Sequence, residues 1–393
     1  MLCCGVHTTT ARPLSSSNRL AITASLAFFV LGVLISAVGP TLPEIRARHG
    51  LDATGGALVL AALSAGSASG VGFAGRYRHR WPIPRLLTIG ALSLAVGSAG
   101  VPLAPAGGYV AAGLYVAGLG IGILGLLLNL VVANSYGDRG GVVLSLVSAV
   151  FGVSAVLTPL IIGRAPEQFA TPYLIAAAGA LALLTLTTTT RTPPTSPPIG
   201  ARATRPEART MLLLGGVLLG YVALESGVSG WETTHLRGVT TLSDAASANA
   251  VALFWLGIAV GRVVAAPLAM RWHPGRLVLT SLALGTVSVL AAAYAPLAVV
   301  AYGITGLVLA PVFPAVVVWH SRSVPSGRGA TRVFAAGLAG PVISSPILGA
   351  ATDATSAAAV PWVLAAFGVA TTAAALYYFR TSSPSPASVS GTA

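Results

Sequence analysis

The chain of 393 residues contains no lysine, only nine acidic residues and only two cysteines. Charged residues make up 8% of it, whereas a soluble globular domain carries about 25%. Hydrophobic residues make up 55%, more than a soluble core of this length could bury. This shortage of charge excludes an ordinary soluble domain and indicates that the lipid bilayer is the solvent of this protein.

The residue types that carry chemistry form no catalytic or metal-binding pattern. Cys3 and Cys4 are adjacent, with no third cysteine for a disulfide framework and no spaced histidines for a zinc site. A lipoprotein-type cleavage site is not expected, because only Met1 and Leu2 precede the cysteines. The six histidines lie in loops or at the ends of apolar runs. We therefore expect no catalytic residue, no metal, no cofactor and no enzyme activity.

The formal net charge of +13 reflects basic residues that are all arginine. These arginines lie in short loops between apolar runs, and no basic block is interleaved with aromatic residues, so nucleic-acid binding is not expected. They crowd one alternate set of loops, together with the tails and the segment 191–210, whereas most acids lie in the other set. Arginine is retained on the cytoplasmic side. The pattern predicts a multi-pass protein of the cell (inner) membrane with both termini cytoplasmic.

Apolar runs of about 20 residues, the length that crosses roughly 30 Å of hydrocarbon, recur along the whole chain. The predicted spans are 20–42, 54–75, 86–104, 107–135, 142–163, 172–190, 211–231, 245–269, 277–295, 297–319, 333–351 and 360–379. A proline-rich linker interrupts the series after the sixth span. The predicted units are a tail at 1–19, a six-helix half at 20–190, the linker at 191–210, a second half at 211–380 and a tail at 381–393.

Prolines fall inside or at the ends of several runs, where each is expected to remove a backbone donor and kink its helix. They are Pro40, Pro43, Pro159, Pro267, Pro311, Pro314, Pro341 and Pro346.

The two halves share a repeat at an offset of 191 residues. The turn at 80–86, after the second run, recurs as the turn at 271–277, after the eighth. The paired arginines of these turns are Arg80 and Arg85 in the first half and Arg271 and Arg276 in the second. The same offset aligns Gly39 with Gly230. Two halves related by an axis along the membrane normal are an expected transporter layout, and the paired turns are candidate gates on the cytoplasmic side.

The first of these turns resembles the signature of the major facilitator superfamily, a glycine followed by Asp-Arg-x-Gly-Arg-Arg. Here the motif occupies 75–85, with His79 in place of the aspartate and Pro82 in place of the second glycine. The resemblance implies an all-α membrane protein of twelve transmembrane helices in two pseudo-symmetric six-helix bundles. Because the acid is missing, any charge relay of this turn must be altered.

Longer stretches resemble the fucose/glucose proton symporter branch of that superfamily. They are 118–129, 151–159, 221–231, 254–262 and 311–314. This resemblance implies a secondary active transporter that moves a small organic solute by alternating access. The proton-handling acids of the branch align with Gly39 and Gly125 here, so their roles cannot be carried over.

Glu225 lies well inside the seventh predicted span and is the only acid inside any of them. A carboxylate within the membrane is costly, which makes a functional role the default hypothesis. A buried carboxyl that gains and loses a proton would serve proton coupling. Alternatively, Glu225 pairs with Arg262 or caps a broken helix end.

Arg262 lies in the inner half of the eighth span, and its backbone is expected to be more than a turn deeper than Glu225. It either acts as a gating residue near Glu225 or extends toward the cytoplasmic interface beside Arg271.

Three further residues are candidates for the substrate pathway. Asn129 follows a glycine ladder in the fourth span and could either bind the solute or bridge two helices. Tyr221 lies one turn before Glu225 on the same helix face, and Trp255 lies in the next span. The two aromatic rings could stack on a sugar or face lipid.

Taken together, the sequence predicts a monomeric transporter of a small solute, with sugars as one class and the proton as coupling ion. An efflux antiporter of the same fold remains open, because the antiport signature of the fifth span is reduced to 158–163. A non-transporting receptor or scaffold is the alternative of a different class.

Overall fold

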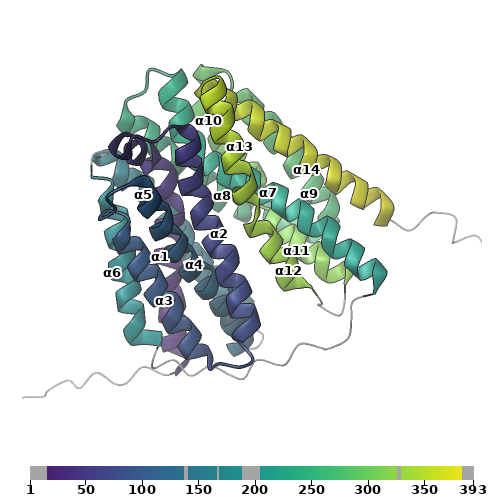
Figure 1. The fold of residues 1–393 in the computed structure, drawn as a ribbon. Helices are drawn as coiled ribbons and strands as arrows, with labels where there is room; N and C mark the ends of the chain where they lie inside the picture. The colour runs from purple at the N-terminus through teal and green to yellow at the C-terminus, as the bar shows by residue number, and fades with distance from the viewer. Residues whose placement is uncertain (1–15, 137–139, 166–167, 188–203, 325–328, 383–393) are drawn as a thin grey trace, which may run out of the picture.

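The computed structural model describes residues 16–136, 140–165, 168–187, 204–324 and 329–382 (Figure 1). Cys3, Cys4 and most of the predicted tails and linker lie outside these residues. The helices are α1 (Ser16–His49), α2 (Ala53–Tyr77), α3 (Ile83–Gly100), α4 (Gly107–Ser135), α5 (Gly140–Arg164), α6 (Ala170–Thr187), α7 (Arg205–Val239), α8 (Asp244–Arg271), α9 (Pro274–Ala291), α10 (Ala298–Leu309), α11 (Val312–Ser323), α12 (Ala330–Leu338), α13 (Gly340–Ala354) and α14 (Val360–Ser382). Two 3-10 turns, Ala295–Leu297 and Ala357–Ala359, precede α10 and α14.

Twelve segments of the described chain are long and apolar enough to cross a membrane, which confirms the predicted number of spans. Two of these segments consist of two helices each. The tenth span breaks between α10 and α11 at Pro311, and the eleventh breaks between α12 and α13 just before Pro341. Proline has no backbone N–H and its ring collides with the preceding turn, so a helix that reaches it tends to end or kink.

The seventh span differs from the prediction at both ends. Helix α7 begins at Arg205 rather than at 211, because Thr204 and Glu207 form a capping box that starts the helix six residues earlier. It continues to Val239 rather than ending at 231. The apolar run is therefore shorter than the helix that contains it.

The two halves repeat each other in packing as well as in sequence. A β-carbon at Gly66 would collide with the Tyr115 carbonyl, so α2 and α4 approach closely at this glycine. The equivalent residue in the second half is Gly257, where a β-carbon would collide with the Gly303 carbonyl on α10. Small residues allow such backbone contacts between membrane helices. Each half also has its own large cluster of buried apolar side chains.

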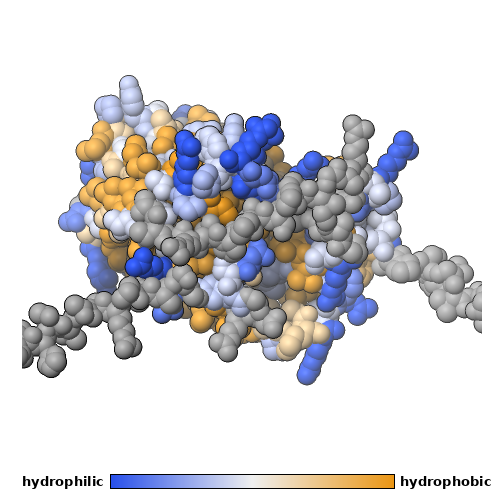
Figure 2. All heavy atoms as spheres, turned by 90° about the horizontal axis from the view of Figure 1, so that it is seen from below, coloured by the Kyte–Doolittle hydropathy of each residue, from blue (hydrophilic) through white to orange (hydrophobic). Residues whose placement is uncertain are grey.

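We name the two membrane sides by the described chain. The linker side is the one where α6 ends at Thr187 and α7 begins at Arg205, the lower side in Figure 1. The far side is the opposite one. In Figure 1 the two halves meet toward the far side and diverge toward the linker side. Figure 2 views the linker side and shows blue hydrophilic residues spread over this face between orange apolar ones.

Large apolar side chains cover much of the outside of the bundle. Val263, Val287 and Leu181 are more than half exposed, and similar residues occur on most other helices. A soluble protein rarely leaves so many such side chains in water. In a bilayer the same surface faces hydrocarbon, as the composition predicts.

Candidate functional site

The Tyr221 hydroxyl donates a hydrogen bond of 2.8 Å to Oε1 of Glu225. Both residues lie on α7, four positions apart, and side chains at that spacing meet on one helix face. Tyr221 is completely buried and Glu225 is partly buried. The sequence analysis predicted this neighbouring pair, and the structure joins the two side chains directly.

Arg262 of α8 acts electrostatically on both Glu225 and Tyr221. Its side chain is exposed, and the ion pairs among the described residues, Arg48–Glu44 and Arg237–Asp244, do not include it. Arg262 lines a cavity of about 240 Å³ between α8, α9 and α11. Arg262 therefore forms no direct salt bridge with Glu225 among the described residues, but it lies close enough to act on Glu225 through its charge. Arg262 supplies a positive charge near the pair.

Trp255 lies where α8 of the second half packs against α5 of the first. Its ring meets Phe151 edge to face at 5.9 Å and also contacts Phe254 at 5.5 Å. The indole N–H is buried and has no hydrogen-bond partner in the described chain. A buried N–H without an acceptor is costly. Trp255 therefore offers a donor at the contact between the halves.

Asn129 is partly buried in α4, and its amide donates 2.7 Å to the carbonyl of Gly125 one turn earlier. This bond lies within one helix, so the amide nitrogen does not form the predicted bridge between two helices. No described interaction brings Asn129 to Glu225 or Trp255. Its place in the substrate pathway stays a prediction.

The paired turns lie on the linker side with exposed arginines. Arg85 lies over the Trp81 ring at 4.7 Å from its centre. Arg80, Arg271 and Arg276 are exposed, and the ion pairs among the described residues do not include their side chains. The halves diverge on this side (Figure 1), and the ion pairs among the described residues do not join these arginines to the other half.

His79 stands where the family signature has an aspartate. The Arg78 Nε donates 3.0 Å to Nε2 of His79. Partial desolvation, and after it the positive charge of Arg78, lowers the pKa of His79. The ring is therefore neutral at pH 7 and does not replace the negative charge of the aspartate.

Sequence reasoning missed Glu232, which the longer α7 places inside the seventh span. The prediction that Glu225 is the only acid inside a span is wrong, because the described spans are longer than the predicted ones and several contain further acids at their ends. Glu232 has no exposed surface, and neither of its carboxyl oxygens has a hydrogen-bond partner in the described chain. The only feature of the sequence that could have pointed to Glu232 is its position directly after the apolar run that ends at 231.

The far-side contact between the halves also escaped the sequence analysis. The carboxylate of Asp353, at the end of α13, accepts 2.8 Å from the Ala53 N–H and 2.7 Å from the Thr54 N–H. These are unpaired donors in the first turn of α2, a helix of the other half. A β-carbon at Gly349 would meet Ala57 of the same helix at 2.6 Å. We call this contact of α13 with α2 the far-side latch.

Helices α1 and α7 close the same side of the molecule. A β-carbon at Gly39 would collide with the Ser229 carbonyl and approach the Cα of Gly230 at 2.9 Å. The two glycines that the repeat aligns thus meet across the two halves. We call this contact the glycine seam.

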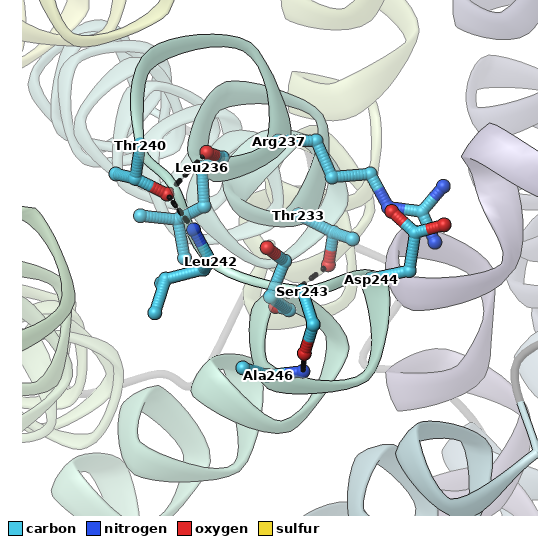
Figure 3. A network of polar contacts seen from close by, with 9 residues as sticks. Thr233, Leu236, Arg237, Thr240, Leu242, Ser243, Asp244 and Ala246 are labelled. Atoms are coloured by element: carbon cyan, nitrogen blue, oxygen red, sulfur yellow. Dashed lines mark hydrogen bonds and ion pairs between the residues drawn. The ribbon is translucent and has the colours of Figure 1, made fainter.

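The turn after α7 holds its far-side end in place (Figure 3). Arg237 and Asp244 form an ion pair at 3.1 Å across the turn. The Thr240 hydroxyl donates 2.6 Å to the Leu236 carbonyl and accepts from the Leu242 N–H at 3.3 Å. These contacts join the end of α7, seven residues beyond Glu232, to the start of α8.

These features define a class: a twelve-helix membrane transport protein made of two equivalent halves. The family model described as Major Facilitator Superfamily matches residues 24–235, over half of the chain, and the protein belongs to that family. The resemblance predicted from the sequence is thus confirmed at the level of the superfamily.

One curated protein and several solved structures give the scale of the similarity. The Cyanate transport protein CynX of Escherichia coli (strain K12) is 29% identical over 143 residues, which are 35% of this chain and 37% of that relative. The match spans little more than a third of the relative's length.

The solved structures are similar over nearly the whole chain. The inward open xylose transporter XylE from E. coli has a TM-score of 0.75 and 14% identity, covering 95% of this chain and 98% of that one. The nucleoside transporter NupG has a TM-score of 0.71 and 12% identity, covering 93% of this chain and 100% of that one. FucP in the outward conformation has a TM-score of 0.64 and 16% identity, covering 92% of this chain and 99% of that one. At these identities the likeness shows the fold.

Proposed function

We propose that this protein is a secondary active transporter that moves a small organic solute across the cell membrane by alternating access, coupled to protons through Glu225. The observation that carries the proposal is the hydrogen-bonded Tyr221–Glu225 pair on α7, the helix that meets α1 of the other half at the glycine seam. A titrating carboxyl on a helix at the contact between the halves can link proton binding to their rearrangement.

The orientation belongs to the same proposal. The linker side is cytoplasmic, because the arginine-rich turns that carry Arg80 and Arg271 lie on it. The protein works as a monomer, since each chain supplies both halves of the alternating pair. In the described conformation the far-side latch and the glycine seam close the external side.

Two solute classes follow from different observations. The structural neighbours include xylose, fucose and nucleoside transporters, which supports a neutral polar solute. The exposed Arg262 near Glu225 supports a small anion, and the curated relative is a cyanate transport protein. An efflux antiporter and a non-transporting receptor are outcomes that the experiment below separates from both.

The experiment is transport by the purified protein in proteoliposomes. Radiolabelled xylose, fucose, a nucleoside and cyanate are offered with an acidic exterior, and then with equal pH on both sides. The proposal predicts accumulation of one class above its external concentration only when the exterior is acidic. Export driven by an inward proton gradient would establish an antiporter. Binding without any movement would establish a receptor and overturn the proposal.

A further inference from the structure

Glu232 is a second carboxyl on α7, and the function proposed above does not use it. It lies seven residues after Glu225, which places both on one face of the helix about 10 Å apart along the axis. It is fully buried, and no described group donates to either of its oxygens. A carboxylate enclosed in apolar surroundings without donors is strongly disfavoured, so this closed site holds the neutral carboxylic acid.

The neighbours of Glu232 form a buried polar group at the far-side end of the second half. Tyr302 of α10 interacts electrostatically with Glu232. Its hydroxyl lies 2.9 Å from Nδ1 of His235, which is one turn along from Glu232 on α7. His235 and Tyr302 are both buried. Two titratable side chains thus accompany the acid, together with the buried hydroxyl residues Thr233 and Thr234.

Other charged groups near this end of the bundle lie beyond that core. The helices packed around the far-side part of α7 contribute Asp244 on α8 and Asp353 on α13, and α7 itself adds Arg237. Helix α1 contributes Glu44, Arg46, Arg48 and His49. Arg237 is paired with Asp244, Glu44 with Arg48, and Asp353 with the first turn of α2.

The contact between the two halves lies next to Glu232 on the same helix. The glycine seam lies at Ser229 and Gly230, two to three residues before Glu232 on the same helix. Alternating access requires this seam to open when the far side opens. Opening would bring water to the end of α7 and remove the condition that keeps the acid neutral.

We propose that Glu232 is a second proton site, which releases its proton to external water when the glycine seam opens and must be reprotonated before the seam closes. The inference rests on the proposed alternating access. The proton passes from the carboxylic acid to water, and the carboxylate that remains is stable only while it is hydrated. Alkaline external pH should therefore favour the seam-open state.

The test measures opening of the far side directly and needs no transported solute. A negative result here can therefore be told apart from a negative result in the transport assay. Cys3 and Cys4 are replaced by serine, and Ala57→Cys places one thiol under the far-side latch. A membrane-impermeant maleimide is added from outside at increasing pH. Rates are divided by those of Leu103→Cys, an exposed position on the far side, which removes the pH dependence of the thiol itself.

We expect the normalised labelling rate to rise with pH and Glu232→Gln to hold it at the low, acid value at every pH. Glu232→Asp keeps a titrating group and should keep the rise. An unchanged pH profile in Glu232→Gln would overturn the proposal, as would identical profiles for the Gln and Asp variants.

Discussion

The Tyr221 hydroxyl donates a hydrogen bond to Glu225. The phenol lies one helical turn below the carboxyl and is itself fully buried, so it has little freedom to bond elsewhere. A hydrogen bond to the ionised form contributes more than one to the neutral form. The hydroxyl therefore matters most in the step in which Glu225 carries its charge.

Tyr221→Phe removes this donor and keeps the ring. Hydrogen bonds to charged groups contribute about 1.5–3 kcal/mol, so we expect proton-driven accumulation to fall by roughly tenfold or more. Initial uptake rates in proteoliposomes measure it. Tyr173→Phe is the matched control, because it removes a buried hydroxyl that bonds Thr41 at 2.8 Å in the other half. Equal rates in the two variants would show that the Tyr221 hydroxyl has no role in coupling.

At the residue scale the sequence predicted side chains on one helix better than side chains on different helices. Tyr221 and Glu225 are four residues apart, and helical geometry alone brings them together. The meeting of Tyr302 with His235 depends on how α10 packs against α7, which no spacing in the sequence contains. Glu232 was missed because the predicted span stopped at residue 231, at the end of the apolar run, whereas the helix continues to Val239.

Among the helices, α1 and α7 form the contact between the halves that the repeat could have suggested. The offset pairs Gly39 with Gly230, and residues equivalent in two pseudo-symmetric halves lie at matching distances from the axis. Two such residues meet only if they are near the axis itself. The sequence repeat therefore predicts that Gly39 and Gly230 are equivalent, but only the packing of α1 against α7 shows that they are in contact.

Gly39→Ala should disrupt the glycine seam. Its methyl group would collide with the Ser229 carbonyl, and overpacking of this kind costs about 1–3 kcal/mol. We expect faster maleimide labelling of Ala57→Cys from the far side and a lower unfolding temperature. Gly72→Ala is the control, because a β-carbon there meets no atom within 4 Å. Labelling at the wild-type rate in Gly39→Ala would contradict a closed seam.

The linker-side turns allow a second test between elements. Arg80 and Arg271 are exposed where the halves diverge, and we expect them to make matching contacts when that side closes. Replacing either by alanine should slow turnover several-fold while the protein still inserts. Arg380→Ala, at the exposed end of α14, is the control for loss of one positive charge. Wild-type turnover in both turn variants would leave them as topology signals only.

Proline shows how far element boundaries follow from local sequence. Pro311 and Pro341 coincide with breaks, as predicted. Pro159 and Pro267 instead lie inside the continuous helices α5 and α8, and so do Pro40 and Pro43 in α1. Neighbouring helices and side-chain hydroxyls can satisfy the carbonyl that proline frees.

For the whole molecule, hydropathy was enough to predict twelve spans and the repeat to predict two halves. The side on which the halves meet could not be predicted, because open and closed states contain the same helices and the same sequence supports both. The latch of Asp353 on α2 belongs to one of these states. Contacts that form in only one state leave no periodic pattern.

The orientation in the membrane can be tested on the intact chain. Reporter fusions at Thr195, which lies outside the described residues, and in the C-terminal tail should both be cytoplasmic, because the arginine-rich turns lie on that side. A fusion at Thr240, in the turn between α7 and α8, should be external. Alkaline phosphatase and green fluorescent protein activities distinguish the two locations. An external reading at Thr195 would reverse the assignment of both sides.

The measurement that most directly tests the account is transport by Glu225→Gln in proteoliposomes, with and without a proton gradient. The substitution keeps the size of the side chain and removes its titration. We predict that solute exchange at equal concentrations persists and that accumulation driven by external acid is lost, because the halves still alternate but no longer carry a proton. If Glu225 only braces Arg262, both activities should fall together. Accumulation at the wild-type level in Glu225→Gln would contradict proton coupling through this residue.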